Sequence, residues 1–131
     1  MFLRSMRARV LWGGVILALS ALALYYSELL VAAIATSPVP RTAASVEHGQ
    51  VLWKQYCEVC HGADGRGDGP LAASLPRRPK DLTKIALPPI FPDGIVAYRI
   101  ANGGGVMPAW KSVLNTQDIW DLVNFIRSKG Q

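Results

Sequence analysis

The stretch CEVCHG, residues 57–62, contains both cysteines of this 131-residue chain and one of its two histidines. Two cysteines cannot support a disulfide framework, so the pair needs another explanation. Cys57 and Cys60 are separated by about one turn of a helix, which lets both sulfurs face the same side. His61 follows directly and adds an imidazole to the two thiols.

The C-x-x-C-H spacing is the attachment motif for c-type haem. Two thiols add to the vinyl groups of the porphyrin, and the adjacent histidine ligates the iron. The motif therefore predicts one covalent haem c, held by Cys57 and Cys60, with His61 as an axial ligand. A backbone carbonyl should accept from the other ring nitrogen and orient the imidazole, and Pro70 is the expected acceptor.

Two other chemistries use cysteine pairs. A thiol redox pair is expected beside a βαβ pattern, which this sequence lacks. A zinc site needs four ligands, and adding His48 to the motif gives a set without the usual spacing of a second ligand pair. The polar neighbours Glu47 and Gln50 indicate instead that His48 is a solvated surface histidine.

A second axial ligand is expected in the stretch MPAW, residues 107–110. Met1 and Met6 precede the apolar N-terminal segment, so Met107 is the one methionine that follows it. A lone methionine ordinarily packs in a core. Glycines at positions 103–105 allow the backbone to approach a haem closely, which favours iron ligation by Met107. His/Met ligation leaves no open iron position for a substrate, so the pattern predicts electron transfer and no enzymatic activity.

The first 35 residues differ from the rest of the chain. Residues 1–9 contain three arginines and no acid, and residues 10–26 carry no charge. The apolar block continues past Glu28 to Ala35 and reaches the roughly 20 residues that span a bilayer. The sequence predicts a cytoplasmic N-terminus over residues 1–9 and a transmembrane anchor over residues 10–35, with the remainder facing the periplasm. The small residues at positions 33–35 keep open the alternative of a cleaved signal peptide.

Residues 36–43 are predicted to be an extended linker, because TSPVPRT contains two prolines and no apolar period. The haem domain is expected over residues 44–131. Ser45 is the expected N-cap of a helix that runs to about residue 56.

The end of the chain predicts a second long helix. Asn115 is a suitable N-cap, and Asp118 stands three residues later, where an acid suits the start of a helix. An apolar stripe then recurs at helical spacing, at Ile119, Leu122, Val123 and Ile126. A short helix is expected near residues 92–101, and no alternating strand pattern appears, so the domain is predicted to be all-α.

Over residues 44–130 the chain resembles class I cytochromes c. Beyond CEVCH, Gly49 and Trp53 stand eight and four residues before the first cysteine, as in that family, and Leu122 and Phe125 are similar to a family pair on the last helix. The stretches GRGDGP, PKDLT and MPAW are similar to loops of small bacterial members. The resemblance implies helices packed around one covalent haem, an exposed haem edge, and a hydrogen bond from His61 to the Pro70 carbonyl. The N-terminal anchor departs from the many soluble members.

The combined prediction is a membrane-anchored periplasmic monohaem cytochrome c that carries single electrons between respiratory redox partners, such as a quinol-oxidising complex and a terminal oxidase. One alternative is an integral subunit of a multisubunit membrane oxidoreductase complex, since Gly13 and Gly14 permit close helix packing. A second alternative is a haem enzyme or gas sensor in which Met107 leaves the iron.

Charge gives a modest indication of the partners. Eleven basic and eight acidic residues follow residue 35. Loops after the motif contain five of the basic residues, which either steer docking with an acidic redox partner or are merely solvated; these are Arg66, Arg77, Arg78, Lys80 and Lys84. Neither nucleic acid nor a small-molecule substrate is expected, because the basic excess is small and the chain is exported.

Overall fold

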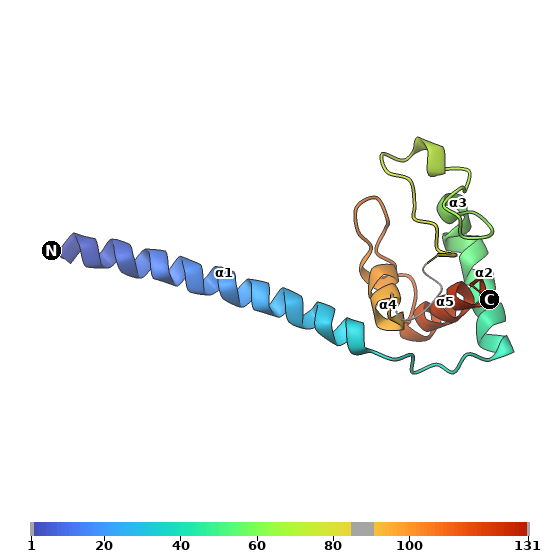
Figure 1. Ribbon diagram of the computed structural model, residues 1–131, viewed down its shortest axis with the longest axis horizontal. Helices are drawn as coiled ribbons and strands as arrows, with labels where there is room; N and C mark the ends of the chain where they lie inside the picture. The colour runs from blue at the N-terminus through green and yellow to red at the C-terminus, as the bar shows by residue number, and fades with distance from the viewer. Residues whose placement is uncertain (1, 85–90, 131) are drawn as a thin grey trace. The chain divides into compact units, whose positions relative to one another are not determined.

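The computed structural model describes residues 2–84 and 91–130, with side chains from residue 11 onward (Figure 1). Its contacts divide the chain into two compact units, residues 1–31 and residues 32–131. Residues 1, 85–90 and 131, and the side chains of the three N-terminal arginines, lie outside the described part.

The N-terminal unit is formed by helix α1, Phe2–Ile34. Its segment Leu11–Ile34 is 24 residues long with a mean hydropathy of 2.0, which is long and apolar enough to cross a membrane. At 1.5 Å per residue such a segment is about 36 Å long, against a hydrocarbon core of about 30 Å. Large apolar side chains are exposed along it, including Trp12 and Tyr26. The predicted apolar helix of membrane-spanning length is therefore present.

The second unit contains the remaining helices: α2 (Ala43–Tyr56), α3 (Glu58–His61), a short 3-10 helix η1 (Ala72–Ser74), α4 (Asp93–Asn102) and α5 (Thr116–Ser128). Among the described residues there is no β-strand, and one isolated bridge joins Gly104 and Met107. The all-α prediction is confirmed, and the expected short helix near residues 92–101 corresponds to α4.

The first and last helices of the domain, α2 and α5, form its main helix pair. They approach so closely at Gly49 that a Cβ atom there would lie 2.1 Å from the carbonyl oxygen of Asp121. One turn further along α2, the ring of Trp53 packs against Phe125 at a centroid distance of 5.7 Å. Trp53 and Leu122 are almost fully buried. The crossing of α2 and α5 is thus built on a glycine that admits the partner backbone.

The two helix starts were predicted with different success. Asn115 and Asp118 form a complete capping box at the start of α5, each side chain accepting from the other residue's backbone N–H. At α2 the prediction of Ser45 as N-cap was wrong, because Thr42 caps the helix by accepting from Ser45 N at 3.1 Å. Ser45 lies inside the first turn, and its hydroxyl instead donates to Asp121 on α5.

Helix α4 joins the same core through Val96, Ala97 and Ile100. A partly buried ion pair links it to α5, since Arg127 Nε donates to Asp93 Oδ1 at 2.6 Å in the first turn of α4. Arg127 also donates to the backbone carbonyl of Phe91, just before that turn. The core therefore brings together the helices that surround the C-x-x-C-H stretch and the segment containing Met107.

Candidate haem site

The C-x-x-C-H stretch lies where α2 ends and the single turn of α3 begins. Cys57 is the last residue of the α2 hydrogen-bonding pattern, donating its backbone N–H to Trp53 O. The chain then makes one further turn, in which His61 N donates to Cys57 O at 2.9 Å. Both cysteines are free thiols, Cys57 buried and Cys60 partly exposed. The local fold therefore keeps the two sulfurs and the imidazole within about one helical turn.

The Cys57 thiol has an apolar environment. Burial, reinforced by the neighbouring Cys60, raises the pKa of Cys57 to about 12. Reactive and redox-active thiols have lowered pKa values, because positive charge or a helix N-terminus stabilises the thiolate. In the part of the chain that the structure describes, no three His, Cys, Asp or Glu side chains gather as a metal site. The raised pKa disfavours the thiol redox pair.

His61 has one nitrogen without a partner. Burial lowers the pKa of the imidazole, which favours the neutral form that ligates metals. Its ring lies 5.7 Å from the Trp53 ring. Nδ1 is buried and has no hydrogen-bond partner among the described residues, so the expected bond to the Pro70 carbonyl is not formed here. Buried polar atoms are normally hydrogen-bonded, so His61 is an exception within the described residues.

The loop after His61 is held against α3 by backbone hydrogen bonds. Gly67 N donates to His61 O, and Gly69 N donates to Cys60 O. A Cβ atom at Gly69 would lie 2.5 Å from Glu58 O, so no larger residue fits that position. These bonds hold the loop against the α3 backbone. The requirement for glycine at position 69 was not predicted from the sequence, although the closely spaced glycines of GADGRGDG indicated it.

Met107 lies on a tight loop between α4 and α5. Gly104 and Met107 exchange two backbone hydrogen bonds, of 3.0 and 3.2 Å. Gly103 has a positive φ of 67°, and a Cβ atom there would lie 2.5 Å from Met107 O. Glycine is therefore required at position 103, where the backbone reverses. The glycines at positions 103–105 were expected to allow a close approach of the backbone. The structure shows such close packing between Gly103 and the backbone of Met107.

The Met107 loop is connected to both sides of the site. Trp110 N donates to Ile100 O on α4 at 3.1 Å, and the Trp110 ring packs on Tyr56 at a centroid distance of 5.2 Å. Tyr56 directly precedes Cys57 in the sequence. Cys57 belongs to the hydrophobic core, and Met107 packs against that same core. The structure thus brings the predicted attachment thiol of Cys57 and the predicted thioether ligand of Met107 to one apolar cluster that also includes Trp53, the ring neighbour of His61.

The residues present fit a covalently attached porphyrin. The two free thiols at one helical turn match the spacing of its vinyl groups. The partly buried imidazole of His61, whose lowered pKa favours the neutral form, and the partly buried thioether of Met107 would supply the nitrogen and sulfur ligands that haem iron accepts. When bound, haem supplies reversible one-electron chemistry at its iron. The chain would supply the attachment atoms, both axial ligands and an apolar surrounding.

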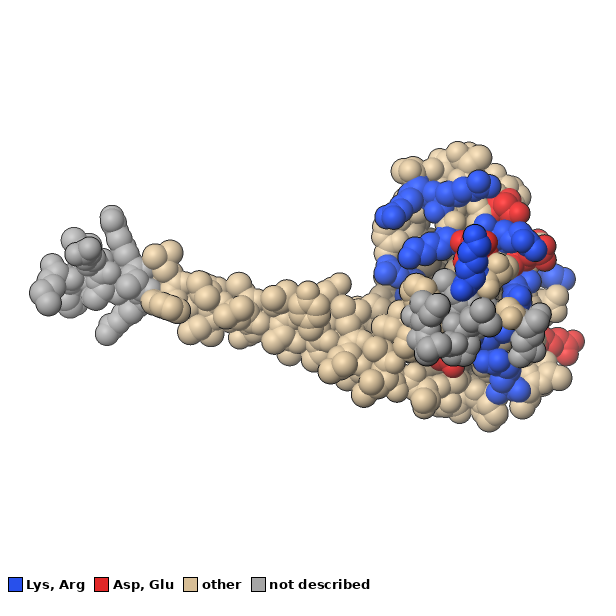
Figure 2. Space-filling view, viewed as in Figure 1, with Lys and Arg blue, Asp and Glu red and all other residues tan. Residues whose placement is uncertain are grey.

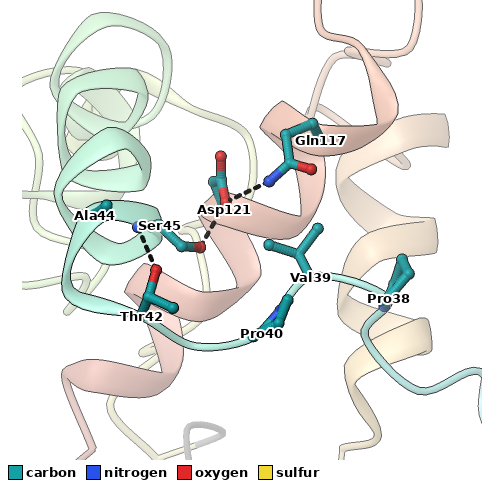
Figure 3. A pocket seen from close by; sticks show the side chains of 8 residues that line it. All are labelled: Pro38, Val39, Pro40, Thr42, Ala44, Ser45, Gln117 and Asp121. Atoms are coloured by element: carbon teal, nitrogen blue, oxygen red, sulfur yellow. Dashed lines mark hydrogen bonds between the residues drawn. The ribbon is translucent and has the colours of Figure 1, made fainter.

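His48 lies elsewhere and takes part in a different arrangement. Its side chain is 48% exposed, as expected for a surface histidine, but Nδ1 lies 2.8 Å from Asp121 Oδ2. Asp121 is buried and also accepts from Ser45 and Gln117. Figure 3 shows Ser45, Gln117 and Asp121 where α2, α5 and the linker meet. Sequence reasoning missed this cluster, because its bonds join residues more than 70 positions apart.

Basic side chains cover part of the domain surface. Figure 2 shows Lys and Arg side chains close together on one face of the second unit. The five basic residues of the loop after His61 are all exposed. Lys84 pairs with Asp81 at 3.5 Å and Arg66 with Asp64 at 3.9 Å. These are exposed pairs of small energetic weight, so the loop keeps a positive character.

Comparison with known proteins agrees with this site. Residues 44–126 match the family model described as cytochrome c oxidase, cbb3-type, subunit III. The chain is 30% identical over 91 residues to the cbb3-type cytochrome c oxidase subunit FixPc of Rhizobium leguminosarum bv. viciae, an alignment covering 70% of this chain and 30% of that relative. It is 27% identical to cytochrome c6 of Bumilleriopsis filiformis over 67% of this chain and 95% of that protein.

A solved structure shares the fold. A chain of the Kuenenia stuttgartiensis reducing HAO-like protein complex superposes with a TM-score of 0.62 at 29% identity, covering 72% of this chain and 47% of that one. The present chain thus spans under half of that protein and 30% of the FixPc relative. The chain belongs to the cbb3-type subunit III family and is a monohaem class I c-type cytochrome with covalently bound haem c.

Proposed function

We propose that this protein is a membrane-anchored electron carrier whose haem is attached at Cys57 and Cys60 and ligated by His61 and Met107. One observation carries the assignment of these four residues. The loop of Met107 packs on the core that contains Cys57, through the Trp110 contact with Tyr56. Ligands separated by 46 positions in the chain thereby belong to one site.

Electron transfer suits this ligand set better than catalysis. If His61 and Met107 both bind the iron, no iron position remains for a substrate. The surrounding core residues are apolar, including Leu52, Trp53 and Ile100. The chain's own residues would therefore hold and desolvate the redox centre.

The domain organisation proposed from the sequence places the anchor over residues 10–35, the linker over 36–43 and the haem domain over 44–131. Helix α1 supplies a segment of spanning length. The arginines of residues 1–9 favour a cytoplasmic N-terminus, because positively charged flanks remain inside. The haem domain then faces the periplasm from a single-pass inner-membrane anchor.

The partners proposed for this carrier are redox proteins with acidic docking surfaces. The exposed basic loop after His61 supports this choice, since opposite charges accelerate encounter. A second candidate function is that of a subunit held within a larger membrane oxidoreductase complex. That candidate is favoured by the matching relatives named as cbb3-type oxidase subunits.

Substitution of Met107 by alanine tests the ligand assignment. The reduced native protein should bind carbon monoxide slowly or not at all, whereas the Met107→Ala protein should bind it rapidly at the opened iron position. Met6→Ala is the matched control, because that methionine precedes the anchor segment. Rapid binding by the native protein would favour a gas sensor or enzyme instead. Co-purification of the native protein with fixed partners would distinguish the complex subunit from the free carrier.

A further inference from the structure

The linker between the anchor helix and the haem domain is fastened to the domain. Asn124 Nδ2 on α5 lies 3.3 Å from Val39 O and 3.4 Å from Pro40 O. The Val39 side chain packs against the hydrophobic core. Ser37 Oγ donates to Val39 O and accepts from Val39 N, which holds this part of the linker in a turn. A composition of prolines and small polar residues predicted an extended linker, but the contacts describe a docked one.

The group that fastens the linker is itself held in place. Asn124 is only 2% exposed and Asp121 only 3%. Asn124 Nδ2 donates to Ser45 Oγ at 2.8 Å, and Ser45 Oγ donates onward to Asp121 Oδ1 at 2.5 Å. The Asp121 carboxylate also binds His48 and Gln117. Figure 3 shows Val39 and Pro40 crossing beside Ser45 and Asp121.

Burial of these polar groups would destabilise the fold if the linker did not complete their hydrogen bonds. Buried amides and carboxylates destabilise a fold unless their hydrogen bonds are satisfied. The amide nitrogen of Asn124 has two protons, one of which is directed to Ser45. The linker carbonyls are the remaining acceptors within reach of that nitrogen. Undocking the linker would remove both of these acceptors and leave water as the partner of that N–H, so the network favours the docked state.

We infer that residues 37–40 form a docked strap that fixes where the tether leaves the haem domain. This inference rests on the proposed membrane anchor for its functional consequence. The tether is the segment between α1 and α2, residues 35–42. If all eight residues were free, the tether could extend about 28 Å. Docking at Val39 leaves only residues 35–38 free, which extend about 14 Å. The strap therefore limits the haem domain to partners whose redox centres lie close to the same membrane. An integral membrane partner meets that requirement.

Hydrogen–deuterium exchange of the haem-loaded full-length protein tests the strap. Peptides covering residues 36–42 should be protected in the native protein. Asn124→Ala should increase their exchange rate about fivefold, the effect of losing one hydrogen bond, without changing exchange in α4. Asn102→Ala is the matched control, because Asn102 bonds to Tyr98 and Lys111 and not to the linker. Should Asn124→Ala fail to incorporate haem, Val39→Ser provides the same test from the linker side.

A second measurement connects the strap to the anchor. Arg41 is an exposed trypsin site within the tether. In lipid vesicles, trypsin should release the haem domain several-fold faster from Asn124→Ala than from the native protein. Native linker peptides that exchange like an unfolded chain, or identical exchange in both proteins, would overturn the strap. A protein that fails to enter vesicles would contradict the proposed anchor, and the exchange measurement would still decide the strap.

Discussion

Gly49 on α2 faces the backbone of Asp121 on α5 so closely that an added Cβ atom would lie 2.1 Å from the Asp121 carbonyl oxygen. The atoms that such a side chain would meet belong to the backbone and to Phe125 Cβ, which cannot rotate away. The crossing of the two helices therefore depends on glycine at this position. The same helix, one turn further, carries Trp53 and then Cys57, so the crossing also sets the position of the haem attachment site.

Replacement of Gly49 by alanine should destabilise the haem domain. Overpacking of this kind costs about 1 to 3 kcal/mol, because α2 and α5 must move apart. Denaturant unfolding of the haem-loaded protein measures the change. Gln50→Ala, at the exposed neighbouring position on α2, is the control and should change stability by less than about 0.5 kcal/mol. Equal stability of the two variants would show that the helices do not cross at Gly49.

Removal of the α5 capping box should weaken the last helix. Asn115 accepts from Asp118 N, and Asp118 accepts from Asn115 N, both at 3.0 Å. Asn115→Ala should reduce the free energy of unfolding by about 1 kcal/mol. Thr116→Ala, one position later on the exposed surface, is the control. The same loss in both variants would show that the effect does not come from the cap.

Asp81 should titrate at unusually low pH. The Thr83 hydroxyl, which donates to Asp81 Oδ1 at 2.6 Å, lowers the pKa of that carboxyl, with help from the Thr83 backbone and Lys84. A folded pKa below the unfolded one means that the interaction stabilises the loop above about pH 4. That contribution is lost as the pH falls through the lowered pKa. Thr83→Val should raise the Asp81 pKa in an NMR titration of the reduced, diamagnetic protein.

The basic loop should control reaction with anionic redox partners. Arg77→Glu should slow reduction of ferricyanide, an anionic oxidant, by about two- to fivefold at low ionic strength. The difference should diminish in high salt, because exposed charges are screened. Lys54→Glu places the same charge change on α2 and is the control. If both variants slow the reaction equally, net charge rather than this loop governs the encounter.

Local sequence signals accounted for much of the fold. The capping box at Asn115 and the apolar stripe of α5 depend on neighbours within one or two turns, and both were predictable. The Ser45 prediction failed because Thr42 is an equally good cap, and because the Ser45 hydroxyl has a partner 76 positions away. The docked linker depends on Asn124 in the same way. Hydrogen bonds between distant segments leave no periodic pattern in a sequence.

The same difference between local signals and long-range contacts applies to the candidate site. Cys57, Cys60 and His61 form a contiguous motif whose chemistry follows from its spacing. The assignment of Met107 as a ligand stays a prediction and rests on the one methionine that follows the apolar segment. The contact that brings its loop to the motif, between Trp110 and Tyr56, depends on tertiary packing. The unpartnered Nδ1 of His61 likewise became evident only from burial and neighbouring atoms.

The most direct test of this account is the intact mass of the protein purified from the membrane fraction of its own cells, with peptide mapping of the haem adduct. We predict a chain that retains α1 and carries one haem, attached within the peptide containing Cys57 and Cys60. A chain without haem, or with haem outside that peptide, would contradict the central claim. A haem-bearing chain that starts near Thr36 would retain the site and contradict the anchor.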